Sequence, residues 1–182
     1  MHLTALVLSA LALGAAATPV KVAPGPYAES LIDMAGITGR VEFYKPPKCG
    51  DAKTLVKYQF DGLTAGDSAP YKYHIHVNPV GENNNCTATG GHYDPHSAAT
   101  THTPYTCTPG VTPQDQCEVG DLSGKHGSLA PTAEAPQVSG QYIDQYVKFT
   151  PENTIIDRSI VIHNSKGDRI ACANIDAVMV ML

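Results

Sequence analysis

The sequence has little positive charge and no long apolar run beyond its first residues. Its 12 lysines and arginines stand against 17 aspartates and glutamates, which gives a net charge of -5 at neutral pH and a pI of about 5.8. This mildly acidic balance carries no electrostatic signal for nucleic acid or anionic membranes. No second apolar stretch is long enough to span a bilayer. We therefore expect no nucleic-acid partner and no membrane span.

The N-terminus indicates export. Residues 1–17 form a short apolar run that ends in three alanines, which is typical of a secretory signal peptide and too short for a transmembrane helix. A retained signal anchor is the alternative. Asn85 begins an Asn-Cys-Thr glycosylation sequon, which fits export. We expect a signal peptide over 1–17, glycosylation at Asn85, and a secreted chain that resides in the medium or at the cell wall.

Helical periodicity is hard to find, and proline and glycine interrupt the chain throughout. Apolar and polar residues instead alternate over 37–44 and 56–61, which is the period of half-buried strands. Further strand candidates are residues 71–77, part of 138–149, 159–163 and 170–181. This pattern predicts an all-β sandwich or barrel, in which the irregular residues 78–123 form a functional or clamped loop. We expect one domain over 36–182, preceded by an N-terminal extension over 18–35.

Five cysteines in an exported chain indicate disulfides, with one residue left over. We favour a Cys86–Cys172 pair, because both residues lie near candidate ligand segments, and secondly a Cys107–Cys117 pair around a proline-rich loop. Cys49 would then be free or paired between chains. The sequence alone does not fix the connectivity, and a free Cys107 and Cys117 is the alternative. Oligomeric state is equally open, with a monomer favoured.

Four of the eight histidines lie in patterns that favour metal binding. His74 and His76 are two residues apart in a strand candidate, so both project from one face and can hold one ion together, while Ile75 faces away. His92 lies in a Gly-Gly-His-Tyr stretch, and His163 closes an Ile-Val-Ile-His stretch. Imidazole suits copper, nickel, iron and zinc, so the residue type leaves the metal open.

With their flanking residues, these motifs make the chain resemble the copper/zinc superoxide dismutase family from about residue 36 to residue 175. The family's His-x-His motif, Cys-Thr-x-x-Gly-x-His block, Val-Gly-Asp-Leu turn, last copper histidine and closing Arg-x-Ala-Cys are similar to the stretches at 74–76, 86–92, 119–122, 163 and 169–172. The resemblance implies a Greek-key β-barrel or sandwich with superoxide as its substrate. It also implies that copper is bound by His74, His76, His92 and His163.

Two departures separate this chain from the zinc-bearing members of the family. The position before Val-Gly-Asp, a zinc-ligating histidine in those members, is Glu118, and His96 and His102 only straddle the place of another ligand. The long electrostatic loop between the last copper histidine and the arginine is shortened to residues 164–168. The chain therefore most resembles the extracellular copper-only superoxide dismutases of fungi, which implies one copper per chain and no zinc.

The resemblance also implies catalytic roles for Arg169, His92 and Glu118. Glu118 would hold the second ring nitrogen of His92, because a ligating imidazole needs a partner that fixes its tautomer. Asp121 is a second carboxylate that can help. His92 would gain and lose a proton as copper cycles between Cu(II) and Cu(I). Arg169 would attract and orient the superoxide anion beside the metal.

Two other functions stay open at the level of sequence. A bimetallic copper/zinc dismutase would bind zinc through His92, His96 or His102, Glu118 and Asp121. A non-catalytic copper-holding module is the other, because a fold does not guarantee an activity. The full ligand set together with Arg169 argues for turnover. For His96, His102 and His126, which lie in loop sequence, we expect solvated side chains.

Overall fold

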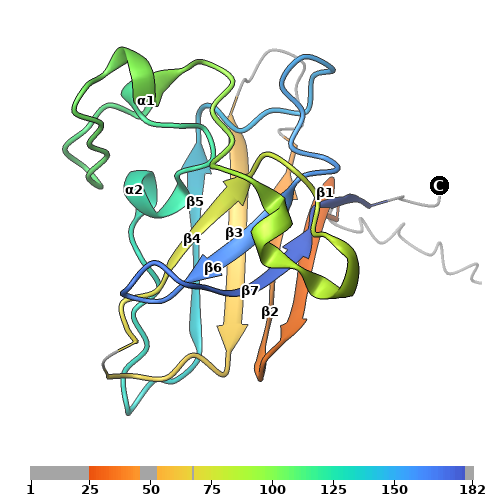
Figure 1. Cartoon of the computed structure of the whole chain (residues 1–182), viewed down its shortest axis with the longest axis vertical. Helices are drawn as coiled ribbons and strands as arrows, with labels where there is room; N and C mark the ends of the chain where they lie inside the picture. Colours follow the sequence, from red (N-terminus) through yellow and green to blue (C-terminus); the bar gives the residue numbers. More distant parts are fainter. Residues whose placement is uncertain (1–24, 46–52, 67, 179–182) are drawn as a thin grey trace, which may run out of the picture.

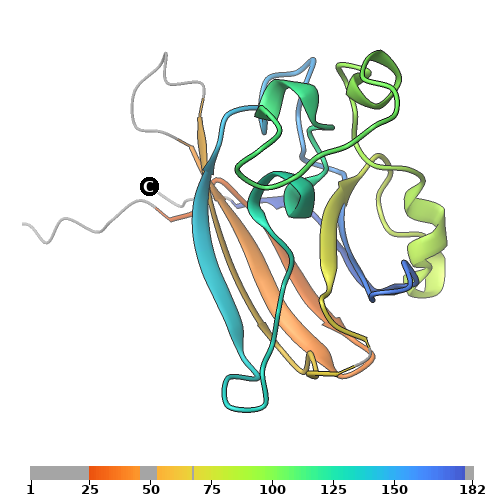
Figure 2. The same ribbon diagram turned by 90° about the vertical axis from the view of Figure 1, so that its left-hand side faces the viewer.

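Two antiparallel β-sheets face each other as two layers (Figure 1, Figure 2). The computed structural model describes residues 25–45, 53–66 and 68–178. The five-stranded sheet has the order β5-β3-β2-β1-β8, and the three-stranded sheet has the order β4-β6-β7. The strands are β1 (Ala28–Met34), β2 (Ile37–Tyr44), β3 (Thr54–Asp61), β4 (Lys72–His76), β5 (Val138–Asp144), β6 (Ser159–His163), β7 (Arg169–Asn174) and β8 (Asp176–Ala177).

The core lies between the two sheets and follows the alternation of the strands. In β2 the buried residues Ile37, Val41 and Phe43 alternate with residues that keep contact with solvent. From the other layer, Tyr73 and Ile75 of β4 enter the same core. Because neighbouring strand residues point to opposite faces, the histidines of β4 must lie on the outer face of the three-stranded sheet.

That outer face is itself covered, so β6 is buried along its whole length. Ile160 and Ile162 contribute to the core between the sheets, whereas Val161 packs on the outer side against Cys86 and Cys172. The covering segment is the long connection between β4 and β5. It contains the short helices η1 (Glu82–Asn84), η2 (Cys86–Thr89), α1 (Ala98–Thr101), η3 (Gln114–Gln116) and α2 (Leu122–His126).

Two disulfides clamp this connection, as expected for an irregular stretch of its length. Cys86 is bonded to Cys172 of β7, with a Cα–Cα distance of 5.7 Å, which fastens η2 onto the three-stranded sheet. Cys107 is bonded to Cys117 with a Cα–Cα distance of 5.4 Å and closes a local loop. Asn85 is exposed, and its side chain accepts a hydrogen bond from the Thr87 N–H at the start of η2.

The first strand begins earlier than the sequence predicts. Residues 28–34, inside the expected N-terminal extension over 18–35, form β1, which pairs with both β2 and β8. The sheet therefore includes at least part of the segment expected as an extension before residue 36. The run predicted over 170–181 is divided into β7 and β8.

Three expectations lie outside the described residues: the signal peptide over 1–17, the state of Cys49, and the last part of the C-terminal strand at 179–182. Within the described parts of the chain, no helix has the length and apolar character needed to cross a membrane.

Candidate metal centre

Four histidines converge on the outer face of the three-stranded sheet. His74 and His76 come from β4, His163 from the end of β6, and His92 from the connection after η2. One ring nitrogen of each lies within 4.8 Å of the corresponding nitrogens of the other three. His92 is the most accessible ligand, with 27% of its side chain exposed, whereas the other three are buried. The structure thus brings together all four predicted copper ligands and leaves one of them facing solvent.

Each of these imidazoles has one nitrogen held by an oxygen of the protein. The contacts are His74 Nε2 to Asp121 Oδ1 at 3.4 Å, His76 Nδ1 to the Gly90 carbonyl at 2.9 Å, His92 Nδ1 to Glu118 Oε2 at 2.5 Å, and His163 Nδ1 to the Gly167 carbonyl at 3.1 Å. A carbonyl or carboxylate can only accept, so the held nitrogen carries the proton and the other nitrogen keeps its lone pair. This is the arrangement that fixes metal-ligating histidines.

The remaining nitrogens fit a cation. His74 Nδ1 is buried without a hydrogen-bond partner, which is costly for a polar atom unless something binds it. The Nε2 atoms of His76 and His163 lie 3.2 Å apart. The Nδ1–H groups of His76 and His163 donate to the Gly90 and Gly167 carbonyls, so both Nε2 atoms are unprotonated. Their lone pairs therefore face each other across the 3.2 Å between them. A metal ion coordinated by these nitrogens would satisfy both observations.

Burial keeps three of the four imidazoles, those of His74, His76 and His163, neutral near pH 7. Burial lowers the pKa of His74 to about 4, although the hydrogen bond to Asp121 opposes the shift. Burial likewise lowers the pKa of His76 to about 3, against the effect of the Gly90 carbonyl. The pKa of His163 is lowered for the same reason. Metal binding requires unprotonated imidazole, so no proton has to be displaced from these ligands at neutral pH.

The Val-Gly-Asp-Leu turn is fastened directly to the ligand segments. The Ile75 N–H donates to the Gly120 carbonyl at 2.9 Å, and the Gly120 N–H donates to the Tyr93 carbonyl at 2.7 Å. A Cβ at Gly120 would lie 2.2 Å from the Ile75 carbonyl oxygen, so only glycine allows this close approach. The turn therefore places Glu118 against His92 and Asp121 against His74.

Asp121 begins α2 as its N-cap, and its side chain accepts from the Gly124 N–H at 2.7 Å. It also accepts from the Tyr105 hydroxyl at 2.8 Å and contacts His74. Burial acts to raise the pKa of Asp121, but the contact with His74 and these hydrogen bonds lower it to about 2. An ionised carboxylate is thus fixed beneath His74.

Arg169 lies beside the site with its guanidinium anchored on the η2 segment. Nη1 donates to the Cys86 carbonyl and to Thr89 Oγ1, both at 2.8 Å, and Nη2 donates to the Gly90 carbonyl at 2.7 Å. The Gly90 carbonyl also accepts from His76, so a single oxygen joins the arginine to a ligand. A fixed positive charge therefore lies next to the four histidines.

The short turn between β6 and β7 contributes to the centre. Asn164 Oδ1 accepts from the N–H groups of Lys166 and Asp168, which closes the turn. Gly167 adopts a φ of 88° there, a conformation that favours glycine. Its carbonyl is the oxygen that holds His163 Nδ1.

Within the described residues, three further histidines, His96, His102 and His126, lie outside the metal group. His96 is exposed and its ring lies near Tyr146. In the described part of the chain, the four-histidine group is the only metal-compatible cluster of histidine, cysteine and carboxylate residues. No grouping of His96 or His102 with Glu118 and Asp121 is found there.

His126 corrects an expectation. It was expected to be a solvated loop residue, but it ends α2, its ring stacks on Tyr142 at a centroid distance of 3.7 Å, and Nε2 lies 2.9 Å from Asp144 Oδ2. The buried Lys125 Nζ lies 2.6 Å from the same oxygen. The α2 turn carries both side chains inward, where the Asp144 carboxylate of β5 contacts them.

The sequence did not indicate several residues that form hydrogen bonds to the histidines, to Arg169 or to Asp121. The Gly90 and Gly167 carbonyls are backbone groups and leave no side-chain signal. Thr89 is fully buried and contacts both Arg169 and His76 Nδ1, and Tyr105 contacts Asp121. These contacts depend on how the connection folds back, which no local pattern records.

Fold and site together define a β-sandwich metalloprotein, and comparison with known proteins specifies which kind. Residues 37–175 match the copper/zinc superoxide dismutase (SODC) family, and the chain belongs to this family. It is 38% identical over 141 residues to the cell surface superoxide dismutase (Cu-Zn) 4 of Candida albicans, in an alignment that covers 76% of this chain and 53% of that protein. The cell surface Cu-only superoxide dismutase 5 of the same organism is 32% identical over 143 residues, with 78% and 55% covered.

The fold is shared with a solved relative. Candida albicans superoxide dismutase 5 in its Cu(II) form matches with a TM-score of 0.70 and 28% identity, covering 87% of this chain and 96% of that chain. The predicted Greek-key β-sandwich and the family resemblance are thereby confirmed. The chain spans about half the length of the curated relatives it matches.

Proposed function

We propose that this chain is an extracellular copper-only superoxide dismutase that converts two superoxide anions and two protons into oxygen and hydrogen peroxide. Copper, when bound, supplies the one-electron chemistry, in which one superoxide is oxidised and a second is reduced. His74, His76, His92 and His163 would hold one copper per chain. The observation that carries the proposal is that each of these imidazoles has one nitrogen contacting a protein oxygen, while one ring nitrogen of each lies within 4.8 Å of those of the other three.

Arg169 would guide the substrate. Its guanidinium is permanently charged and is fixed by the Cys86 and Gly90 carbonyls and Thr89, so it cannot swing away from the ligands. The chain as a whole is negative, with a net charge of -5. Attraction of an anion must therefore come from local charge, and Arg169 is the cation anchored on a ligand's own hydrogen-bond partner.

His92 and Glu118 would manage the proton. Glu118 accepts from His92 Nδ1, which leaves His92 Nε2 as the atom that can gain a proton and release it to the reduced substrate. His92 is also the ligand with the most exposed side chain, so protons and superoxide can reach the centre past it. Asp121 would keep His74 in place from below through its Nε2.

The location of the enzyme follows from its relatives and its N-terminus. The relatives carry cell-surface names, and residues 1–17 have the pattern of a secretory signal peptide. Two disulfides fit an oxidising compartment. We infer that the chain is secreted, with Asn85 as an exposed glycosylation site.

Reconstitution of the metal-free protein tests the proposal against its two alternatives. With one equivalent of Cu(II) and no zinc, the protein should dismutate superoxide in a stopped-flow assay, and added Zn(II) should not raise the rate. Bound copper without turnover would overturn the proposal in favour of a holding module. A zinc-dependent gain in rate that His96→Gln or His102→Gln abolishes would overturn it in favour of a bimetallic enzyme.

A further inference from the structure

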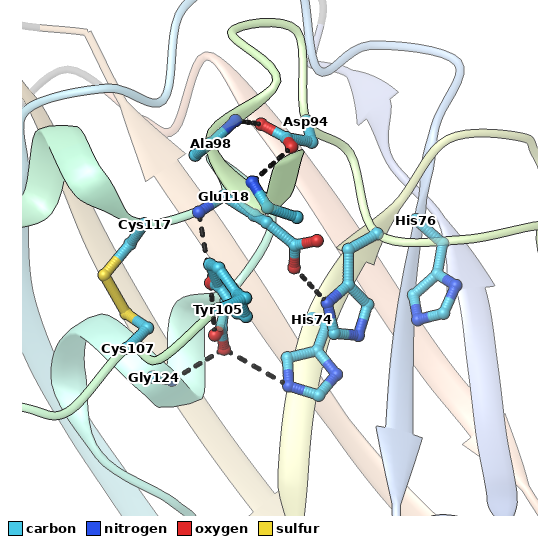
Figure 3. Close-up of polar contacts among 12 residues, drawn as sticks. His74, His76, Asp94, Ala98, Tyr105, Cys107, Cys117, Glu118 and Gly124 are labelled. Atoms are coloured by element: carbon cyan, nitrogen blue, oxygen red, sulfur yellow. Dashed lines mark hydrogen bonds and ion pairs between the residues drawn. A yellow bond between two sulfur atoms is a disulfide. The ribbon is translucent and has the colours of Figure 1, made fainter. Parts of the chain in front are cut away.

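The Tyr105 hydroxyl joins the two acidic residues that hold the metal ligands. It donates to Asp121 Oδ2 at 2.8 Å and accepts from the Glu118 N–H at 3.1 Å (Figure 3). The hydroxyl thus acts as a donor to a carboxylate and as an acceptor from a backbone amide at the same time. Tyr105 is therefore hydrogen-bonded directly to both acidic residues.

Through these contacts Tyr105 reaches two of the four ligands. The other Asp121 oxygen, Oδ1, contacts His74 Nε2, and Glu118 Oε2 contacts His92 Nδ1. Tyr105 touches neither imidazole, so any effect on the centre must pass through the acidic residues. His74 and His92 lie close together, with ring centroids 4.0 Å apart, so a small shift of either carboxylate changes the angle between two ligands.

The segment that carries Tyr105 is held in place independently of the metal ligands. Cys107, two residues after Tyr105, is bonded to Cys117, the residue that precedes Glu118. The disulfide therefore holds together the two ends of the 107–117 loop, which Tyr105 and Glu118 flank. Cys117 is buried, so this closure belongs to the packed part of the protein.

The Tyr105 phenol also keeps its proton at ordinary pH. Burial raises the pKa of Tyr105 far above its ordinary value, and the neighbouring Asp121 and Glu118 raise it further, although the Glu118 N–H opposes them. The hydroxyl consequently remains a neutral donor wherever the protein is folded. A neutral donor steadies Asp121 without adding a charge close to the ligands.

We propose that Tyr105, anchored by the Cys107–Cys117 disulfide, is a positioning residue of the metal centre that orients His74 through Asp121 and His92 through Glu118. This inference rests on the proposed function, because the group it serves is the copper that the four histidines would bind. Tyr105 is not a catalytic residue, since it contacts no reacting atom.

The test is Tyr105→Phe, which removes one oxygen and leaves the ring. Tyr71→Phe is the matched control, because the buried Tyr71 hydroxyl donates to the Thr64 carbonyl at 3.0 Å and accepts from the Thr64 N–H at 3.3 Å, away from the histidines. Copper affinity is measured by competition with a chelator, and ligand geometry by the electron paramagnetic resonance spectrum of the Cu(II) protein. Tyr105→Phe should weaken copper binding about 10-fold, as for loss of a residue that supports a ligand, and alter the spectrum. Tyr71→Phe should leave both unchanged.

A second variant tests the anchor. With Cys107→Ser and Cys117→Ser together, copper affinity and spectrum should change in the same direction as in Tyr105→Phe. Unchanged affinity and spectrum in Tyr105→Phe would overturn the role of the hydroxyl. Equal losses of copper affinity in Tyr105→Phe and Tyr71→Phe would also overturn it, because they would reflect a general loss of stability. An unchanged double serine variant would overturn the role of the disulfide.

These readouts separate the brace formed by Tyr105 from the proposed enzyme. Histidine ring signals in nuclear magnetic resonance spectra of the metal-free protein should shift for His74 and His92 in Tyr105→Phe but not in Tyr71→Phe. If the wild-type protein binds copper without turning over superoxide, the proposed function fails while these shifts and the affinity change still support the brace. If the wild-type protein is active and neither readout moves, the brace fails while the function stands.

Discussion

Replacing Glu118 by glutamine is the sharpest test of the proposed proton transfer through His92. The Glu118 carboxylate accepts from His92 Nδ1, with 13% of its own side chain and 27% of the histidine side chain exposed. Glutamine keeps the shape and still offers a neutral oxygen, but it removes the negative charge that stabilises a protonated His92. Copper should stay bound, because His74, His76 and His163 keep their own hydrogen-bond partners.

The size of the effect follows from the hydrogen bond that is weakened. A hydrogen bond to a charged group contributes about 1.5–3 kcal/mol and a neutral one about 1 kcal/mol. The difference is roughly 0.5–2 kcal/mol, so Glu118→Gln should lower kcat/KM by about 2- to 30-fold. Glu118→Ala removes the acceptor altogether and leaves a partly buried N–H unpaired. Its loss should approach the upper end of the 10–100-fold range seen for partners of metal ligands.

The assay is superoxide decay after pulse radiolysis, with copper content measured on the same samples. Glu134→Gln is the control, because Glu134 is an exposed carboxylate with the same chemistry. The graded order of wild type, glutamine and alanine, with copper near one per chain in the glutamine variant, is the expected result. Full activity in Glu118→Gln with unchanged copper affinity would remove Glu118 from the mechanism.

Three further predictions concern charge, burial and pH. Arg169→Ala should slow dismutation and blunt its dependence on salt, and an unchanged rate and salt slope would refute steering. Asp144→Asn should lower the free energy of unfolding by about 3–5 kcal/mol, because it leaves the buried Lys125 cation unpaired. Burial acts to raise the pKa of Asp144, but Lys125 and its hydrogen bonds hold it well below the ordinary value. The stabilising contribution of the Asp144 carboxylate is therefore present above about pH 4 and lost as the pH falls further. A urea midpoint at pH 7 that Asp144→Asn leaves unchanged would contradict the predicted loss of stability. The folded-state pKa values of His74 and His76 are about 4 and about 3. The metal-free protein should therefore lose stability as the pH falls from about 6.5, because the unfolded chain begins to take up protons there that the folded site excludes. Urea midpoints that do not fall between pH 7 and pH 4.5 would argue against buried, neutral imidazoles.

The sequence predicted the parts of the site that depend on local geometry. The two-residue spacing of His74 and His76 fixes their common face, because the strand period allows nothing else. The contact of Glu118 with His92 was expected from the resemblance to the copper-only dismutases, and the structure places the two in contact. The first inference needed only the period of a strand, whereas the second needed the family resemblance.

The parts that were missed depend on segments distant in the chain. Strand β1 has small buried residues, Ala28 and Ser30, and its Leu31 is 61% exposed, so its composition hides the alternation that the pairing with β2 reveals. His126 is buried by partners of β5 that lie 16 and 18 residues further along. Tyr105 acquires its role only when the connection between the sheets closes on itself. Periodicity records the face of a strand but not the partner that covers it.

The copper and zinc content of the protein purified without added metal, measured with superoxide dismutation on the same sample, tests the central claim most directly. Copper near one per chain, negligible zinc and rapid dismutation are the predicted result. Zinc at a level comparable with copper, or copper without turnover, would contradict the claim that this chain is a copper-only superoxide dismutase.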